Sequence, residues 1–185
     1  MTRIVLARHG QTAWNALGRL QGHTDIELDE VGRDQARSLA HTMATAGIAA
    51  VVTSDLARAK ETGAIVAEAL RLAAPRTDPE LRERRFGVFE GLTRDECASQ
   101  HPAAWRAWVA ATEAPPGGES REHAIARMTR ALERVAAASG PVLVISHGGV
   151  MRLWLMDLLG TTIPLVPNGT TYTVDHDGTR FTATR

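Results

Sequence analysis

The sequence predicts an α/β fold with a mostly parallel central sheet, helices on both faces and an antiparallel edge near the C-terminus. Two patterns support this prediction. Short apolar runs of strand length alternate with longer segments of helical periodicity, which is typical of parallel sheets. Close to the C-terminus, two segments of alternating polarity flank Asp177-Gly178, a dipeptide that favours a hairpin turn and therefore an antiparallel edge.

The first half of the chain supplies two strand–helix pairs. Strands are expected over residues 2–8 and 48–52, and helices over residues 30–46 and 56–72. Gly10 follows the first strand and ends it. The apolar spacing of the two helices predicts their buried faces, which consist of Val31, Leu39 and Met43 in the first and Thr62, Ile65, Val66 and Ala69 in the second.

The second half begins with an irregular stretch, residues 76–92. The capping box Thr93-x-x-Glu96 then starts a short helix. The elements expected after it are a helix following Pro102, a helix with the stripe Ile125, Met128, Leu132 and Val135, a strand over Pro141 to Ser146, a helix carrying Val150, Leu153, Trp154 and Leu158, and strands over about 170–175 and 179–184. A break at residues 115–118 separates the second of these helices from the third.

Composition limits the classes of protein. With 185 residues, the chain is expected to form one domain over residues 1–185, with a small cap or lid contributed by about 81–118. Lys+Arg and Asp+Glu are equal at 21, and no basic run occurs, which argues against a nucleic acid or a membrane surface as partner. Cys97 is the only cysteine, so an internal disulfide and a thiolate metal cluster are excluded. A cytoplasmic location is expected, because no signal-peptide or membrane-spanning pattern is present.

Three buried strands end in polar residues that carry chemistry. These segments are Arg8-His9-Gly10, Thr53 to Arg58, and Ser146-His147-Gly148-Gly149. In a parallel sheet their ends share one edge, so the segments can converge. Guanidinium groups, imidazoles and helix N-termini together bind and polarise a phosphoryl group.

His9 is the candidate nucleophile, because a neutral imidazole can attack phosphorus when its other nitrogen is held as a donor. His147, Arg8 and Arg58 would then lie beside the phosphoryl oxygens as donors. Structural roles are the alternatives: a strand-end histidine bonded to backbone for His147, and a surface ion pair for Arg58.

Six ordered segments resemble the histidine phosphatase superfamily, in its phosphoglycerate mutase-like branch. The resemblance runs over nearly the whole chain. The matching segments are LARHGQTAWN, LQGHTDIELDEVGRDQA, VVTSDLARAKET, LRERRFGVFEGLT, PPGGES and VISHGGVMR. One departure is Phe89, where many members of the family have Trp.

The resemblance implies a role for each site residue. His9 is phosphorylated, Glu83 is the proton donor, and Arg8, Arg58 and His147 hold the phosphoryl oxygens. Asn15, Gln21 and Gly22 line the pocket, and Gly148 offers its backbone N–H. Only the resemblance singles out Glu83, which stands in the charge run Arg82-Glu83-Arg84-Arg85 and has Glu80 and Glu90 as neighbours.

We therefore expect a phosphatase that hydrolyses phosphate monoesters of small molecules through a phosphohistidine, without a metal or cofactor. Metal dependence is disfavoured because the sequence has no close histidine pair, no HExxH motif and no dense carboxylate cluster. A phosphoglycerate mutase is the first alternative, disfavoured because only about 35 residues separate Glu83 from Glu119 and leave little material for a lid that excludes water. A non-catalytic module that binds phosphorylated ligands is the second. The sequence predicts neither the particular ester nor the oligomeric state.

Overall fold

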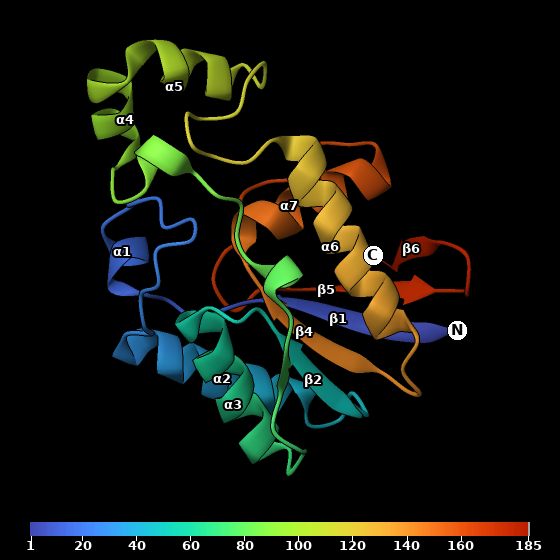
Figure 1. The fold of residues 1–185 in the computed structure, drawn as a ribbon. Helices are drawn as coiled ribbons and strands as arrows, with labels where there is room; N and C mark the ends of the chain where they lie inside the picture. The colour runs from blue at the N-terminus through green and yellow to red at the C-terminus, as the bar shows by residue number, and fades with distance from the viewer. Residues whose placement is uncertain (185) are drawn as a thin grey trace.

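The computed structural model describes residues 1–184 and contains one six-stranded sheet with the order β3-β2-β4-β1-β5-β6 (Figure 1). Strands β1, β2, β3 and β4 pair in parallel, whereas β5 is antiparallel to both β1 and β6. The predicted parallel sheet with an antiparallel C-terminal edge is therefore confirmed. The strands are β1 Thr2–Arg8, β2 Ala50–Thr53, β3 Arg76–Thr77, β4 Val142–Ser146, β5 Thr171–His176 and β6 Phe181–Thr184.

Helices cover both faces of the sheet (Figure 1). They are α1 Ala13–Ala16, α2 Glu30–Met43, α3 Ala57–Ala69, α4 Arg94–Gln100, α5 Pro102–Val109, α6 Arg121–Ala136 and α7 Gly148–Leu159, with single turns of 3-10 helix η1 at Pro79–Leu81 and η2 at Gly87–Phe89. No helix in the described residues is long and apolar enough to cross a membrane.

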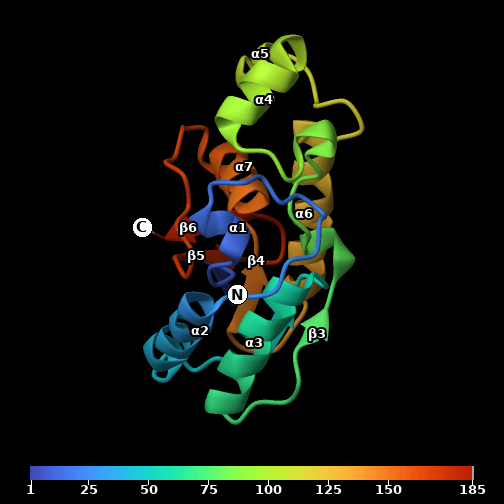
Figure 2. The ribbon, with the colours of Figure 1, turned by 90° about the vertical axis from the view of Figure 1, so that its left-hand side faces the viewer.

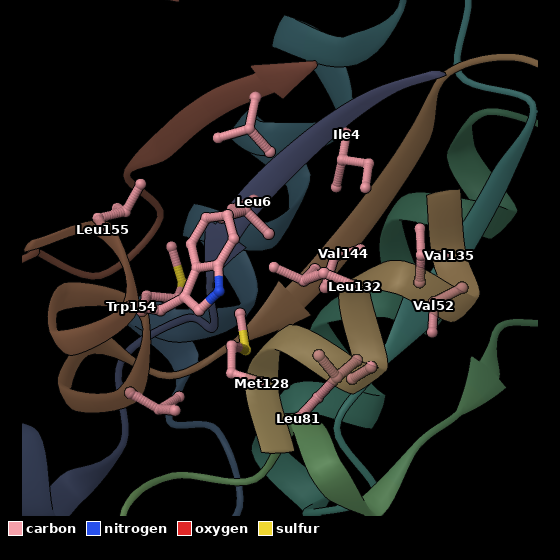
Figure 3. Close-up of a cluster of buried hydrophobic side chains, with 14 of the residues drawn as sticks. Ile4, Leu6, Val52, Leu81, Met128, Leu132, Val135, Val144, Trp154 and Leu155 are labelled. Atoms are coloured by element: carbon pink, nitrogen blue, oxygen red, sulfur yellow. The ribbon is translucent and has the colours of Figure 1, made fainter. Parts of the chain in front are cut away.

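Alternation along the central strands divides the core in two. In β1, Ile4 and Leu6 face α6 and α7, whereas Val5 and Ala7 face α2 and α3. Figure 3 shows the first of these layers, where the side chains of Met128, Leu132 and Trp154 pack over the sheet. Both layers fix the strands firmly, so the residues that follow the strand ends are held on a rigid support.

Several predicted boundaries and faces were wrong in detail. The structure ends α2 and α3 three residues earlier than predicted and shifts β2 toward Thr53, and the short helix α1 and the two-residue strand β3 were not predicted. Val31 is 51% exposed, because α2 approaches the loop at Gln11 through Gly32, where a Cβ atom would lie 2.1 Å from the Gln11 carbonyl oxygen. Ala69 is also exposed, because the buried face of α3 runs through Thr62, Val66 and Ala67.

Helices α4 and α5 form a small layer of their own, set apart from the sheet beyond α7 (Figure 2). An aromatic cluster holds them against η2, with Phe89 fully buried and its ring 5.5 Å from that of Trp105 and 5.8 Å from that of Trp108. The predicted capping box at Thr93 is present and starts α4. This layer falls within the residues predicted to form a cap.

Candidate active site

The three predicted strand ends meet at one edge of the sheet. Arg8 pairs with Ser146 across β1 and β4, so His9 and His147 follow at the same level. The two imidazole rings lie 5.0 Å apart, edge to face. Arg58, in the first turn of α3, reaches the same place, with its Nε atom 3.3 Å from Nδ1 of His147. The structure thus brings Arg8, His9, Arg58 and His147 together, as expected.

His9 is held in one tautomer. It is only 3% exposed, and its Nδ1 atom lies 2.6 Å from the backbone oxygen of Gly10. A carbonyl oxygen can only accept, so Nδ1 carries the proton and Nε2 keeps its lone pair. Burial, together with the charges of Arg58 and Arg8, lowers the pKa of His9 well below its usual value. His9 is therefore a neutral imidazole with a free nucleophilic nitrogen.

His147 has the opposite tautomer. The Nε–H group of Arg58 donates to Nδ1, which leaves the ring proton on Nε2. This Nε2 atom is fully buried and has no hydrogen-bond partner among the described residues. Burial, and then the positive charge of Arg58, lowers the pKa of His147 well below its usual value. An unpaired donor thus lies buried next to His9.

The two arginines are oriented by backbone carbonyls. Arg58 is 1% exposed and donates to the carbonyl oxygens of Gly22 at 2.8 Å and Thr24 at 2.9 Å. Burial lowers its pKa to about 10, so the group stays charged at neutral pH. Arg8 donates to the carbonyl oxygen of Val166 at 2.6 Å, and its buried Nε has no partner in the described chain. Donors without partners beside His9 indicate a site for an anion.

Glu83 comes from the segment between η1 and η2, and its carboxylate lies at the N-terminus of α7. Its carboxylate accepts the backbone N–H groups of Gly149 at 2.9 Å and of Val150 and Arg84 at 2.7 Å. These bonds occupy three of the roughly four lone-pair positions of a carboxylate, which leaves one for a proton. Glu83 is 9% exposed, and it lines the same cavity as His9.

The neighbouring glutamates have structural partners instead. Glu90 accepts the backbone N–H groups of His23, Thr24 and Phe86, and so ties the loop after α1 to the segment after Glu83. Gly22 lies against it with a φ of +54°, and a Cβ atom there would be 2.2 Å from Oε1 of Glu90. Glu80 pairs with Arg130 and Arg134 on α6. Glu90 and Glu80 are absent from the lining of the cavity.

A cavity of about 320 Å³ joins these groups. Of the residues predicted for the site, eight line it: Arg8, His9, Asn15, Gln21, Gly22, Arg58, Glu83 and Gly148. The ninth, His147, is fully buried against His9 and Arg58 and does not line the cavity. Three donors, from Thr12 and Asn168, fix the amide oxygen of Asn15, so its NH₂ group remains for a ligand. The N–H of Gly148, the first residue of α7, has no partner within the helix.

The outer part of the cavity was not predicted as a binding surface. Its walls combine further arginines with apolar side chains, namely Arg19, Arg84, Arg94, Arg152, Phe86, Trp108, Leu153, Leu165 and Val166. Arg19 pairs with Glu96, and Arg84 donates to the backbone oxygen of Glu119. Arg94 and Arg152 have no acidic partner in the part of the chain that the structure describes. In the sequence, the charge run Arg82-Glu83-Arg84-Arg85 was the one available signal of this surface. Of its arginines, Arg84 lines the cavity, whereas Arg82 pairs with Asp55.

An α/β sheet edge that brings two buried histidines, the buried Arg58, the half-buried Arg8 and a carboxylate together at a small cavity is suited to phosphoryl chemistry on histidine. A comparison with known protein families supports this chemistry. The sequence matches the family model of the histidine phosphatase superfamily (branch 1) over residues 4–185. The chain belongs to this superfamily.

Similar proteins carry both phosphatase and mutase names. The chain is 39% identical over 155 residues to phosphoglycerate mutase-like protein 4 of Arabidopsis thaliana, covering 80% of this chain and 67% of that protein. It is 39% identical over 158 residues to a metal-independent phosphoserine phosphatase of the same plant, covering 82% and 66%. The chain thus spans about two thirds of the length of these plant relatives. A solved structure of a mycobacterial glucosyl-3-phosphoglycerate phosphatase superposes with a TM-score of 0.87 at 32% identity, covering 98% of this chain and 96% of that one.

Proposed function

We propose that this protein is a phosphatase that hydrolyses phosphate monoesters of small molecules through a phosphohistidine at His9. The observation that carries the proposal is the hydrogen bond from Nδ1 of His9 to the backbone oxygen of Gly10, which leaves the Nε2 lone pair free beside Arg8 and Arg58. A neutral imidazole held in this tautomer between two cations is equipped to attack an anionic phosphoryl group.

In the first step, the Nε2 lone pair of His9 forms a bond to phosphorus while the bond from phosphorus to the ester oxygen breaks. Glu83 gives its proton to that oxygen, so the leaving group departs as an alcohol rather than an alkoxide. Arg8, Arg58 and the Nε2–H of His147 donate to the phosphoryl oxygens, where negative charge is concentrated in the transition state.

In the second step, a water molecule replaces the alcohol. The Glu83 carboxylate accepts a proton from this water as its oxygen bonds to phosphorus. The bond from phosphorus to nitrogen breaks, its electron pair returns to Nε2 of His9, and inorganic phosphate leaves. Both half-reactions use the same carboxylate, as acid and then as base, which its single remaining lone-pair position permits.

We also propose that residues 81–118 form a cap over the outer end of the cavity and that this cap selects the substrate. Arg94 on α4 lacks an acidic partner in the described chain, and Trp108 on α5 supplies an aromatic wall. A phosphate ester whose alcohol carries a second acidic group fits this combination. The names of two similar proteins, which refer to phosphoserine and glucosyl-3-phosphoglycerate, point to esters of that kind.

We also propose a cytoplasmic location for the protein, in line with its single cysteine.

A phosphoglycerate mutase remains the competing proposal, because the relatives include a mutase-like protein. The two activities share the first step and differ in whether water or a second hydroxyl group receives the phosphoryl group. The short segment between Glu83 and Glu119, which holds two helices of seven and eight residues, favours hydrolysis because it offers little material to exclude water.

The test is a panel of phosphate esters, with and without a second acidic group, assayed for release of inorganic phosphate. Phosphoglycerate mutation is assayed in parallel on the same preparation. We expect phosphate release to be faster than the phosphoglycerate mutase reaction, and fastest on esters with a second acidic group. Mutation faster than hydrolysis would establish the mutase, and binding of esters without turnover would establish a non-catalytic module.

A further inference from the structure

Arg127, on α6, lies beneath the segment that carries Glu83. Its side chain is 7% exposed and makes five hydrogen bonds. Three of them go to backbone oxygens, those of Glu80 at 2.6 Å, Arg82 at 2.7 Å and Glu83 at 3.0 Å. Two go to the carboxylate of Glu119, at 2.7 and 2.9 Å. A guanidinium has five N–H donors, so every donor of Arg127 is used.

The segment held by Arg127 has little regular structure. Residues 82–86 belong to no helix or strand, and they connect the turns η1 and η2. The backbone oxygens of Glu80, Arg82 and Glu83, on both sides of the start of this segment, all accept from the guanidinium of Arg127. These bonds fix the backbone at Glu83. His23 and Ser146 add one bond each, to the backbone oxygens of Glu83 and Leu81. Arg127 alone joins three of these oxygens.

The charge of Arg127 is balanced inside the protein. Glu119 is 9% exposed and binds the guanidinium through both carboxylate oxygens. Arg127 is also absent from the lining of the cavity. A buried arginine that is fully paired and out of reach of a ligand contributes through what it holds, because it has no donor left for a substrate.

We propose that Arg127 is the positioning residue for the proton donor, which deepens and rests on the proposed function. Glu83 is held at two ends: α7 binds its carboxylate through two backbone N–H groups, and α6 binds its backbone through Arg127. A proton donor works only within hydrogen-bond reach of the leaving oxygen, and active-site groups must be held to about 0.5 Å. Without the guanidinium, the backbone of Glu83 is free to shift and the carboxylate moves away from that oxygen.

The test compares single-turnover phosphorylation of the protein by two substrates that differ in their need for a proton. Glycerol phosphate releases a poor alkoxide, whereas p-nitrophenyl phosphate releases a stable phenolate. Glu83→Gln should lose roughly 10²-fold or more on glycerol phosphate, and far less on the aryl ester. Arg127→Lys keeps the charge opposite Glu119 but has three donors instead of five, and should show the same selective loss, about 10-fold or more. In the double variant Glu83→Gln/Arg127→Lys, the second change should add little on glycerol phosphate, because both changes remove the same contribution.

Arg130→Met is the matched control. Arg130 lies on the same helix, is exposed, and among the described residues hydrogen-bonds to the side chain of Glu80, so its loss should leave both rates within about twofold. If Arg127→Lys fails to fold, Arg127→Met/Glu119→Gln carries the same test without leaving a buried charge unpaired.

Equal losses on both substrates, or no loss on either, in a folded Arg127 variant would overturn the positioning role and leave the proposed function intact. A wild-type protein that forms no phosphoenzyme from either ester would overturn the proposed function, and the positioning role with it.

Discussion

The inner and outer ends of the cavity are built in different ways. At the inner end, His9, Arg58 and His147 follow strand ends of the rigid sheet, are buried, and have their orientations fixed by hydrogen bonds to one another and to backbone. At the outer end, Arg94 and Trp108 come from the short helices of a separate layer. Arg94 is exposed and has no acidic partner among the described residues, and Trp108 is half-buried.

This difference separates two tasks. A reaction at phosphorus needs the same geometry for every ester, and a sheet edge supplies a fixed one. Recognition of the alcohol needs a surface that differs between proteins, and loops and small caps supply it. The comparison predicts that changes at the inner end reduce the rate with all esters, whereas changes at the outer end alter the choice among them.

The largest effect is expected at the nucleophile. His9→Ala removes the attacking nitrogen, so turnover should fall on the order of 10⁴-fold or more with every ester. The measurement is kcat/KM on an alkyl and an aryl phosphate. His41→Ala, an exposed change on α2, is the control and should leave the rate unchanged. Wild-type turnover in His9→Ala would move the nucleophile elsewhere.

The arginines at the inner end come next. Arg58→Ala and Arg8→Ala should each lower kcat/KM by about 10²–10³-fold on both classes of ester, and lysine replacements should restore only part of it. An ammonium group lacks the planar pair of donors that matches two phosphoryl oxygens. Arg37→Ala, on the surface of α2, serves as the control. An effect confined to one class of ester would place the arginine at the outer end instead.

A smaller and more selective effect is expected at the outer end. Arg152→Gln should raise KM by roughly 10-fold for esters with a second acidic group, because a charge-assisted hydrogen bond is lost, and should leave p-nitrophenyl phosphate unaffected. Arg106→Gln, an exposed change on α5 outside the cavity, should alter neither. A uniform loss across the panel would contradict the division between the two ends.

A change of pH should have little effect on His9. An unperturbed histidine becomes protonated as the pH falls through about 6.5. Because the pKa of His9 is lowered well below that value, its imidazole should stay neutral at pH 6 and retain the Nε2 lone pair. NMR of ¹⁵N-labelled protein between pH 8 and about 5 reports the protonation directly. A transition of His9 at or above about 6.5 would contradict the role of burial described above.

Chelation is expected to have the smallest effect of all. The described residues contain no group of three His, Cys, Asp or Glu side chains that could hold a metal ion, and Arg8 and Arg58 can neutralise the phosphoryl charge. Dialysis against EDTA should therefore leave most of the phosphatase rate. Loss of activity that one divalent ion specifically restores would show that the arginines do not suffice.

The sheet and the inner end of the site could be predicted because they rest on local patterns. Apolar runs that stop at polar residues mark strand ends, and parallel pairing then brings Arg8, His9 and His147 to one edge without further information. Buried helix faces were predicted less accurately: Val31 has the expected apolar character, but the neighbouring Gly32 makes the close approach to the loop at Gln11.

Glu83 and the outer end depend on contacts between distant segments. Nothing in the charge run around Glu83 distinguishes it from Glu80 or Glu90, because its place follows from bonds to α6 and α7 that are 44 and more residues away. Trp108 has the spacing of a core residue and does pack on Phe89, yet it also lines the cavity. Periodicity predicts that a side chain is covered, and it does not predict what covers it.

The most direct test of the central claim is to trap the phosphoenzyme. Wild-type protein is mixed with a ³²P-labelled ester, quenched in base, digested and mapped by mass spectrometry, with Glu83→Gln protein in parallel. We predict up to one phosphate per chain, located on His9, stable in base, labile in acid, and absent from His9→Ala. Phosphate on His147 or any other residue, or turnover without a phosphoenzyme in a rapid-quench experiment, would contradict the role of His9 as nucleophile.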